Sequence, residues 1–164
     1  MIGARKWAGF RSVLCPIDFS EHSRRALEYA AAVALDAKAG LQVVYVTDPL
    51  LVAAAAAAAA LRNQPLHEQS ARELQTFIDA TLPPRTQTRL GVTAHVRVGN
   101  PADEILKAAA RHRSDLIVVG SHGANAAKRL LVGSTTIDLL QRSAVPVLAI
   151  PRRLRRRPSR AQPR

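Results

Sequence analysis

The residues best suited to chemistry lie in one glycine-rich segment, G-S-H-G-A-N-A-A-K-R-L-L-V-G-S-T-T, from Gly120 to Thr136. Glycine lets backbone N–H groups approach a ligand closely, and a helix N-terminus adds unpaired donors and about half a positive charge. Gly133, Ser134 and Thr135 are therefore predicted to hold a phosphate chain. On spacing alone, the alternative is that the glycines and hydroxyl residues shape a turn and cap a helix.

A histidine and two cations lie inside the same segment. His122 beside a phosphate chain could act as an acid or a base, but without a second base or a positioned carboxylate it is expected to serve as a hydrogen-bond donor. Lys128 and Arg129 have two interpretations: they neutralise phosphate charge, or they stay solvated, because exposed cations gain little from fixed partners. The other histidines show no metal-ligand spacing, so no metal site is expected in the protein alone.

The second candidate for chemistry is Asp18, in the segment C-P-I-D-F-S. It follows an apolar run that predicts a strand, so its carboxylate is expected at the carboxyl end of that strand. There it could accept hydrogen bonds from ribose hydroxyls or lie near a nucleotide base. The alternative is a strand-end residue that is satisfied by nearby backbone groups. Val46, near the end of the next predicted strand, is more simply a core residue.

The elements that position these candidates follow from a regular alternation of short apolar runs and helical patterns along the sequence. This alternation is typical of a parallel sheet covered by helices on both faces. Strands are predicted at residues 13–17, 41–47, 92–98, 115–120 and 145–150. Ser20 is expected to cap a helix that Gly40 ends, Asn100 and Pro101 to open another, and residues 134–142 to form a third. Eight consecutive alanines between the second and third strands predict a helical or partly disordered spacer.

Five strands with right-handed crossovers make a small doubly wound α/β sheet. In the common order 3-2-1-4-5, the first and fourth strands are neighbours where the strand order reverses. Ligands bind such sheets beyond the carboxyl ends of the strands at that point. The segments that carry Asp18 and Gly120 are therefore expected to meet there.

The formal net charge of +12 is concentrated at the two ends of the chain. Residues 152–164 carry seven arginines and no acid, and residues 1–12 carry three cations and no acid, which leaves the middle at +2. The Arg-rich end is expected to be a mobile tail, because it has too few apolar residues to fold. Such a tail is either solubilising or in weak, salt-dependent contact with polyanions.

The composition narrows the class of protein further. Apolar residues make up 48% of the chain but aromatic residues only 4%, so no aromatic cluster is available as a base-stacking platform for nucleic acid. Cys15 is the single cysteine, which excludes an internal disulfide and fits a reducing compartment. With no apolar run of signal-peptide or membrane-spanning type, a cytoplasmic protein is expected.

Together these motifs resemble the universal stress protein family, in its ATP-binding subclass. The ATP motif of the family is G-x-x-G-x9-G-S/T, and Gly120, Gly123, Gly133 and Ser134 match it position by position. The opening V-L-C-P-I-D-F-S-E resembles the first strand of the family, and P-V-L-A-I-P resembles the last. The resemblance covers residues 11–151 and implies a fold like that of the adenine-nucleotide α-hydrolases. Residues 1–10 and the tail 152–164 are then basic extensions of one domain.

The resemblance implies ATP as the ligand, with Mg2+ brought by the nucleotide. Asp18 would contact the adenosine part, and Pro16 and Val46 would line the adenine pocket. The glycine-rich segment would provide Gly120 near the ribose, Ser121, His122 and Gly123 along the phosphates, and Gly133, Ser134 and Thr135 at the distal phosphates.

The function expected from this site is a nucleotide-dependent regulatory module of the stress response, in which ATP biases dimerisation or a partner surface. The resemblance also implies a homodimer joined through the strand from Val145 to Ile150, an apolar strand at a predicted sheet edge. The alternative is a slow ATPase or an autophosphorylating enzyme with Ser134 or Thr135 near the distal phosphate. The regulatory interpretation is favoured because the chain has no Walker A lysine motif, no acidic pair placed for Mg2+ and no evident residue to activate water.

Overall fold

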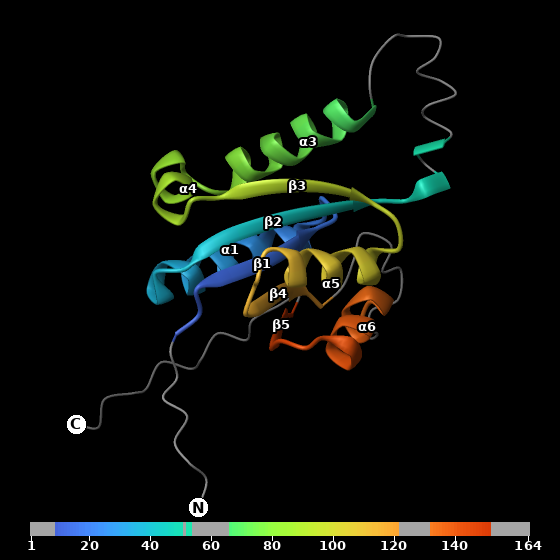
Figure 1. Cartoon of the computed structure of the whole chain (residues 1–164). Coiled ribbons are helices and arrows are strands. Elements are labelled where there is room, and N and C mark those ends of the chain that lie inside the picture. Colours follow the sequence, from blue (N-terminus) through green and yellow to red (C-terminus); the bar gives the residue numbers. More distant parts are fainter. Residues whose placement is uncertain (1–8, 51, 54–65, 122–131, 152–164) are drawn as a thin grey trace, which may run out of the picture.

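Five strands form one parallel sheet in the order β3-β2-β1-β4-β5 in the computed structural model, which describes residues 9–50, 52–53, 66–121 and 132–151 (Figure 1). Every neighbouring pair of strands runs parallel. The predicted strand order and the doubly wound α/β class are therefore confirmed. The strands are β1 (Ser12–Ile17), β2 (Gly40–Thr47), β3 (Thr93–Val98), β4 (Leu116–Gly120) and β5 (Val147–Ile150).

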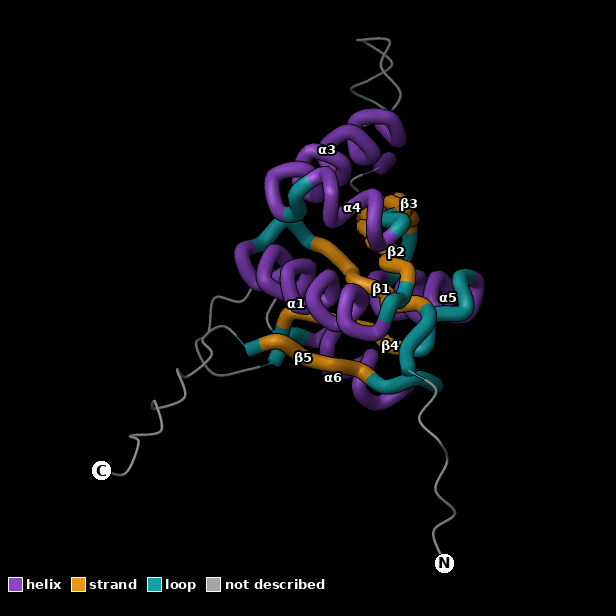
Figure 2. The backbone as a smooth tube through the Cα atoms, turned by 90° about the vertical axis from the view of Figure 1, so that its left-hand side faces the viewer, coloured by secondary structure: helices purple, strands orange, loops and turns teal. Residues whose placement is uncertain are grey.

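Helices cover both faces of this sheet (Figures 1 and 2). The helices α1 (Glu21–Ala37) and α3 (Leu66–Thr81) pack on one face, and α5 (Pro101–Arg111) and α6 (Ser134–Arg142) pack on the other. A short helix, α4 (Pro84–Leu90), follows α3 and was not predicted. Among the described residues, no helix is long and apolar enough to cross a membrane.

Side-chain alternation along the strands divides the core into two layers. In β1, Val13 and Cys15 lie in the cluster beneath α1 and α3, whereas Leu14 lies in the cluster beneath α5 and α6. Helix α1 buries four alanines, at positions 26, 30, 31 and 34, against the sheet. Small side chains at these positions let the helix lie close to the strands, which suits a core with few aromatic residues.

The start of α1 agrees with the prediction, but its end does not. The Ser20 hydroxyl caps the helix by accepting the Ser23 N–H at 3.1 Å. The helix ends at Lys38 in a left-handed conformation, with a φ of 55°, rather than at Gly40. Two backbone hydrogen bonds, to the carbonyls of Ala34 and Leu35, hold this turn and offset the modest strain of a residue with a Cβ.

Gly40 instead begins β2, where its N–H donates to the Arg11 carbonyl at 2.9 Å. The other four strands also begin one or two residues away from their predicted starts, and two of these differences have a clear cause. The strand β4 begins after Asp115, whose carboxylate accepts the N–H groups of Arg11 and Ser12. The strand β5 begins at Val147, because residues 143–145 form a local hydrogen-bonded turn through the Ser143 hydroxyl.

Several predicted segments lie wholly or partly outside the described residues. Helical residues 52–53 include the first alanine of the eight, and the other seven are not described. The tail 152–164 and residues 1–8 of the N-terminal extension also lie outside the described part of the chain.

Candidate functional site

The hydrogen bonding between β1 and β4 stops partway along the two strands. Pairing with β2 extends over all of β1, whereas pairing with β4 covers only Val13 with Leu116 and Leu14 with Ile117. Pro16 lies two residues beyond this paired part and has no N–H to donate. Since β1 and β4 are the neighbours at which the strand order reverses, their unpaired carboxyl ends lie at the position where doubly wound sheets bind ligands.

A network of buried hydrogen bonds joins the end of β4 to its surroundings. The Ser121 N–H donates to the Ile150 carbonyl of β5 at 2.8 Å, and the Ser121 carbonyl accepts the Gly133 N–H at 2.9 Å. The Thr136 hydroxyl of α6 donates to the Gly120 carbonyl at 2.9 Å. The first turn of α6 is thereby held directly beside the end of β4. Ser121 and Gly133 also join the two ends of the segment that lies between them.

The N-terminus of α6 has neither a side-chain cap nor an acidic residue in its first turn. Gly133 is its N-cap, in an extended conformation, and no side chain caps the helix. Helix geometry gives the N–H groups of Ser134, Thr135 and Thr136 no intrahelical acceptor, and no acidic residue occupies the first turn. Unpaired donors and the positive end of the helix dipole favour phosphate at this place.

The role expected for Gly133 needs a correction. It was expected to hold distal phosphates together with Ser134 and Thr135, but its own N–H is occupied by the Ser121 carbonyl. Its φ of −60° and ψ of 146° are open to any residue, so the backbone itself does not require glycine here. A glycine at this position has no Cβ that could cover the helix N-terminus.

Gly120 has a packing role that the sequence did not reveal. A Cβ at this position would lie 3.1 Å from the backbone carbon and oxygen of His22, which is tighter than almost all real contacts. Glycine therefore lets the first turn of α1 approach the end of β4, a close helix–strand contact of the kind that a glycine also provides in dinucleotide-binding folds.

Asp18 lies at the carboxyl end of β1, as expected. One of its carboxylate oxygens accepts both the N–H of Ser20, at 3.0 Å, and the Ser20 hydroxyl, at 2.5 Å. Because Ser20 caps α1, these contacts show that the local backbone role considered for Asp18 exists.

Pro16 and Val46 lie on the same side of the sheet. Their neighbours Cys15, Ile17 and Tyr45 belong to the α1 side, so alternation directs Pro16 and Val46 to the side of α5 and α6. Pro16 is buried, and Val46 is half-buried against the α5 and α6 cluster. The simpler interpretation of Val46 as a core residue is compatible with this packing, and so is a partly exposed wall of a pocket.

Residues 122–131 of the glycine-rich segment lie outside the described residues, and they include four of the candidates: His122, Gly123, Lys128 and Arg129. The eight other predicted site residues are described, and the structure gathers them at the carboxyl ends of β1, β2 and β4 and at the start of α6. The sequence analysis missed Thr136, whose buried hydroxyl fixes α6 to β4. The pair of threonines after Ser134 is the signal that could have indicated it.

Two histidines away from this site stack on each other. The rings of His95 on β3 and His112 after α5 lie 4.1 Å apart, and His95 contacts the Gln42 side chain at 2.8 Å. Burial lowers the pKa of both imidazoles, and the nearby Arg97 and Arg111 lower it further. In the described part of the chain, no three His, Cys, Asp or Glu side chains gather in a way that could hold a metal ion.

Comparison with known proteins settles the family. The model of the universal stress protein family matches residues 9–151. The chain belongs to the universal stress protein family. Universal stress protein A homolog 1 of Coxiella burnetii is 31% identical over 147 residues, which cover 86% of this chain and 96% of that protein.

Solved universal stress proteins share the fold. The structure of MJ0577 from Methanocaldococcus jannaschii is 26% identical, with a TM-score of 0.70, and the match covers 88% of this chain and 98% of that one. Another universal stress protein, solved in complex with cAMP, is 23% identical with a TM-score of 0.60, over 87% of this chain and 97% of that one. At that identity the likeness is one of fold.

Proposed function

We propose that this universal stress protein is a nucleotide-binding regulatory module that holds ATP at the carboxyl ends of β1 and β4. The observation that carries the proposal is the N-terminus of α6, which has no side-chain cap and is hydrogen-bonded to the end of β4 where pairing with β1 has stopped. A bound cAMP in a protein of the same fold agrees with an adenine nucleotide as the ligand.

Each residue of the site has a chemical role in this proposal. The N–H groups of Ser134 and Thr135 donate to distal phosphate oxygens, and the side-chain-free Gly133 leaves room for them. Asp18 accepts from a ribose hydroxyl while it keeps Ser20 in place as the cap of α1. Pro16 and Val46 form the apolar wall against the adenine ring.

The neighbouring glycine-rich residues complete the phosphate site. Gly120 and Ser121 border the ribose and the first phosphate from the end of β4, and His122 and Gly123 continue along the phosphates. A magnesium ion would arrive with the nucleotide and be held mainly by its phosphates. Bound ATP would then supply negative charge at the positive end of α6.

The second candidate function is slow ATP hydrolysis or self-phosphorylation at the same site. The observation that favours it is the side chain of Ser134, which is exposed in the first turn of α6. A regulatory role remains the proposal, because in the described part of the chain no three His, Cys, Asp or Glu side chains gather in a way that could hold a catalytic metal ion.

The output of the module is proposed to be dimerisation through β5, in a cytoplasmic protein. The strand lies at the edge of the sheet, where its outer backbone groups can pair with a second copy. Large apolar side chains on β5 and on α6 are partly exposed: 39% of Leu148 on β5, and 41% of Ile137 and 53% of Leu140 on α6, are accessible to solvent. The structural domain is proposed as residues 11–151, with residues 1–10 and 152–164 as basic extensions.

Mass spectrometry of the small molecules released from purified protein tests the nucleotide proposal. The expected result is an adenine nucleotide in near-stoichiometric amount, or stoichiometric uptake of added ATP when none copurifies. Failure of the protein to bind ATP, ADP or cAMP at millimolar concentration would refute the proposal. Sustained turnover of ATP that Gly133→Ala abolishes would favour the enzyme instead.

A further inference from the structure

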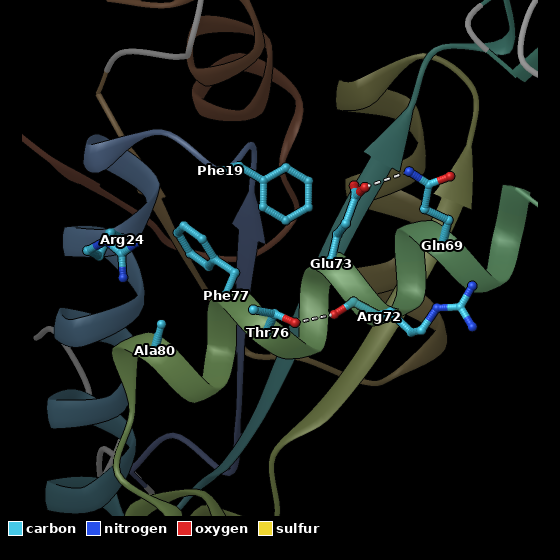
Figure 3. A pocket seen from close by; sticks show the side chains of 8 residues that line it. All are labelled: Phe19, Arg24, Gln69, Arg72, Glu73, Thr76, Phe77 and Ala80. Atoms are coloured by element: carbon cyan, nitrogen blue, oxygen red, sulfur yellow. Dashed lines mark hydrogen bonds between the residues drawn. The ribbon is translucent and has the colours of Figure 1, made fainter.

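A second concave surface lies between α1 and α3, on the face of the sheet opposite Pro16 and Val46 (Figure 3). This α1–α3 groove has a volume of about 580 Å³, and its main lining residues are Phe19, Arg24, Arg72, Glu73, Thr76 and Phe77. Small-molecule sites commonly enclose about 300–1,000 Å³. The groove is therefore large enough for a compact organic ligand, and no role in the proposed nucleotide site accounts for it.

Phe19 is held in the groove at a conformational cost. Its φ of 61° lies in the left-handed region, which is rare and strained for a bulky residue. Ring contacts with Tyr45, at 4.5 Å, and with Phe77, at 5.6 Å, fix this conformation. The two phenylalanine rings give the groove an apolar, aromatic wall between the two helices, as Figure 3 shows.

The polar groups around this aromatic wall differ in how fully they are paired. Glu73 is occupied by the side-chain amide of Gln69, at 2.9 Å. The Arg24 guanidinium lies over the Phe77 ring, 4.7 Å from its centre, donates to the Thr81 hydroxyl and forms an ion pair with Glu21 at 3.4 Å. An arginine stacked on a ring presents a flat cationic surface to a second planar group.

Arg72 provides the available positive charge. Its recorded ion pair is with Glu68, at 4.0 Å, the outer limit of such a contact, and both side chains are about two-thirds exposed. An exposed pair at this distance contributes little, so a ligand anion can replace it at small cost.

We propose that the α1–α3 groove is a binding site for a small planar aromatic anion, such as an aromatic carboxylate. The ring would pack against Phe19 and Phe77 beside the Arg24 guanidinium, and the anionic group would accept from Arg72. The site is independent of the nucleotide proposal, because it lies on the other face of the sheet and uses none of the same side chains.

The test uses 2-naphthoate as the probe and 2-naphthalenemethanol as its neutral analogue, each added to the full chain and followed through backbone amide NMR signals. The carboxylate is expected to shift the amides of Thr76, Phe77 and Ala80 on α3 and to bind about tenfold more tightly than the alcohol. Thr76→Trp, which fills the groove, should abolish these shifts. Gln75→Trp, on the adjacent exposed position outside the groove, should preserve them.

Three outcomes would overturn the proposal. One is the absence of α3 shifts at millimolar 2-naphthoate in protein with a folded spectrum. Another is equal affinity for the carboxylate and the alcohol, or unchanged carboxylate affinity in Arg72→Gln. Either result would show that the ligand's negative charge is not recognised by Arg72. The last is displacement of 2-naphthoate by ATP together with shifts at Ser134 and Thr135, which would place the probe in the nucleotide site.

Discussion

Replacement of Ser134 by aspartate separates the two interpretations of the α6 N-terminus, a phosphate site or an ordinary helix start. Ser134 is exposed in the first turn of a helix that has no acidic residue there and no side-chain cap. An aspartate at this position interacts favourably with the helix dipole, typically by about 0.3–1 kcal/mol, so folding should be slightly more stable. The same carboxylate would repel a phosphate bound to the neighbouring N–H groups.

The expected loss of affinity follows from the charge. One carboxylate about 5 Å from one phosphate charge, at an effective dielectric constant of about 40, is repelled by about 1.7 kcal/mol, which is roughly a twentyfold increase in Kd. The assay is calorimetric titration with ATP, paired with thermal unfolding. Ser134→Asn is the control, because it has a similar size and no charge, and it should bind ATP within a few-fold of the unaltered protein. A Ser134→Asp variant that is more stable and binds ATP unchanged would refute the assignment of phosphates to α6.

Three further outcomes are expected. Thr136→Val removes the hydroxyl that donates to the buried Gly120 carbonyl at 2.9 Å. The free energy of unfolding, measured by urea denaturation, should fall by about 1–3 kcal/mol, and ATP should bind more weakly. An unchanged denaturation midpoint would show that this hydrogen bond does not hold α6 in place. The lowered pKa values of His95 and His112 mean that the unfolded chain takes up protons first, so stability should be constant above about pH 6.5 and fall as the pH drops below it. His112→Phe should flatten this fall between about pH 6.5 and 5, and an unaltered profile would contradict the assignment. Deletion of residues 152–164 should reduce retention on a heparin column at low salt, and equal retention would exclude the tail as a polyanion contact.

The strand order was predictable because it depends on features that extend over many residues. Apolar runs separated by helical patterns require crossovers, and the handedness of crossovers leaves few sheets to choose from. The element ends were less predictable because single interactions decide them. Lys38 ends α1 through two backbone hydrogen bonds, and Asp115 is withdrawn from β4 by the N–H groups that it accepts. Neither contact has a signature in the local sequence.

The positions of the candidate residues in the fold were predictable, but their hydrogen bonds were not. The positions of Asp18 and Ser134 follow from the strand and helix that precede or include them. Two contacts could not be predicted because they depend on how separate segments approach each other in space. The Gly133 N–H donates to the Ser121 carbonyl, and Gly120 lies against His22, about a hundred residues earlier in the chain. The spacing of the glycines matches the family motif in either case, so sequence alone could not assign a packing role to one and an open space to the other.

The proposed nucleotide site and the α1–α3 groove meet at one short segment. Asp18 belongs to the first, and Phe19, the next residue, belongs to the second. The strained backbone of Phe19 is fixed by Tyr45 and Phe77, so α3 packs against the residue that follows the proposed ribose contact. The two sites can therefore be compared in the same NMR titration, since α3 amides report on one and α6 amides on the other.

The central claim is that phosphates bind at the first turn of α6, and a backbone amide NMR titration with ATP tests it most directly. The expected result is saturable shifts at Ser134, Thr135 and Thr136, together with shifts at Asp18 and Gly120, while the amides of Thr76 and Phe77 on α3 stay in place. The claim would be contradicted if ATP shifted no amide signals, or shifted only signals away from α6 and the carboxyl ends of β1 and β4.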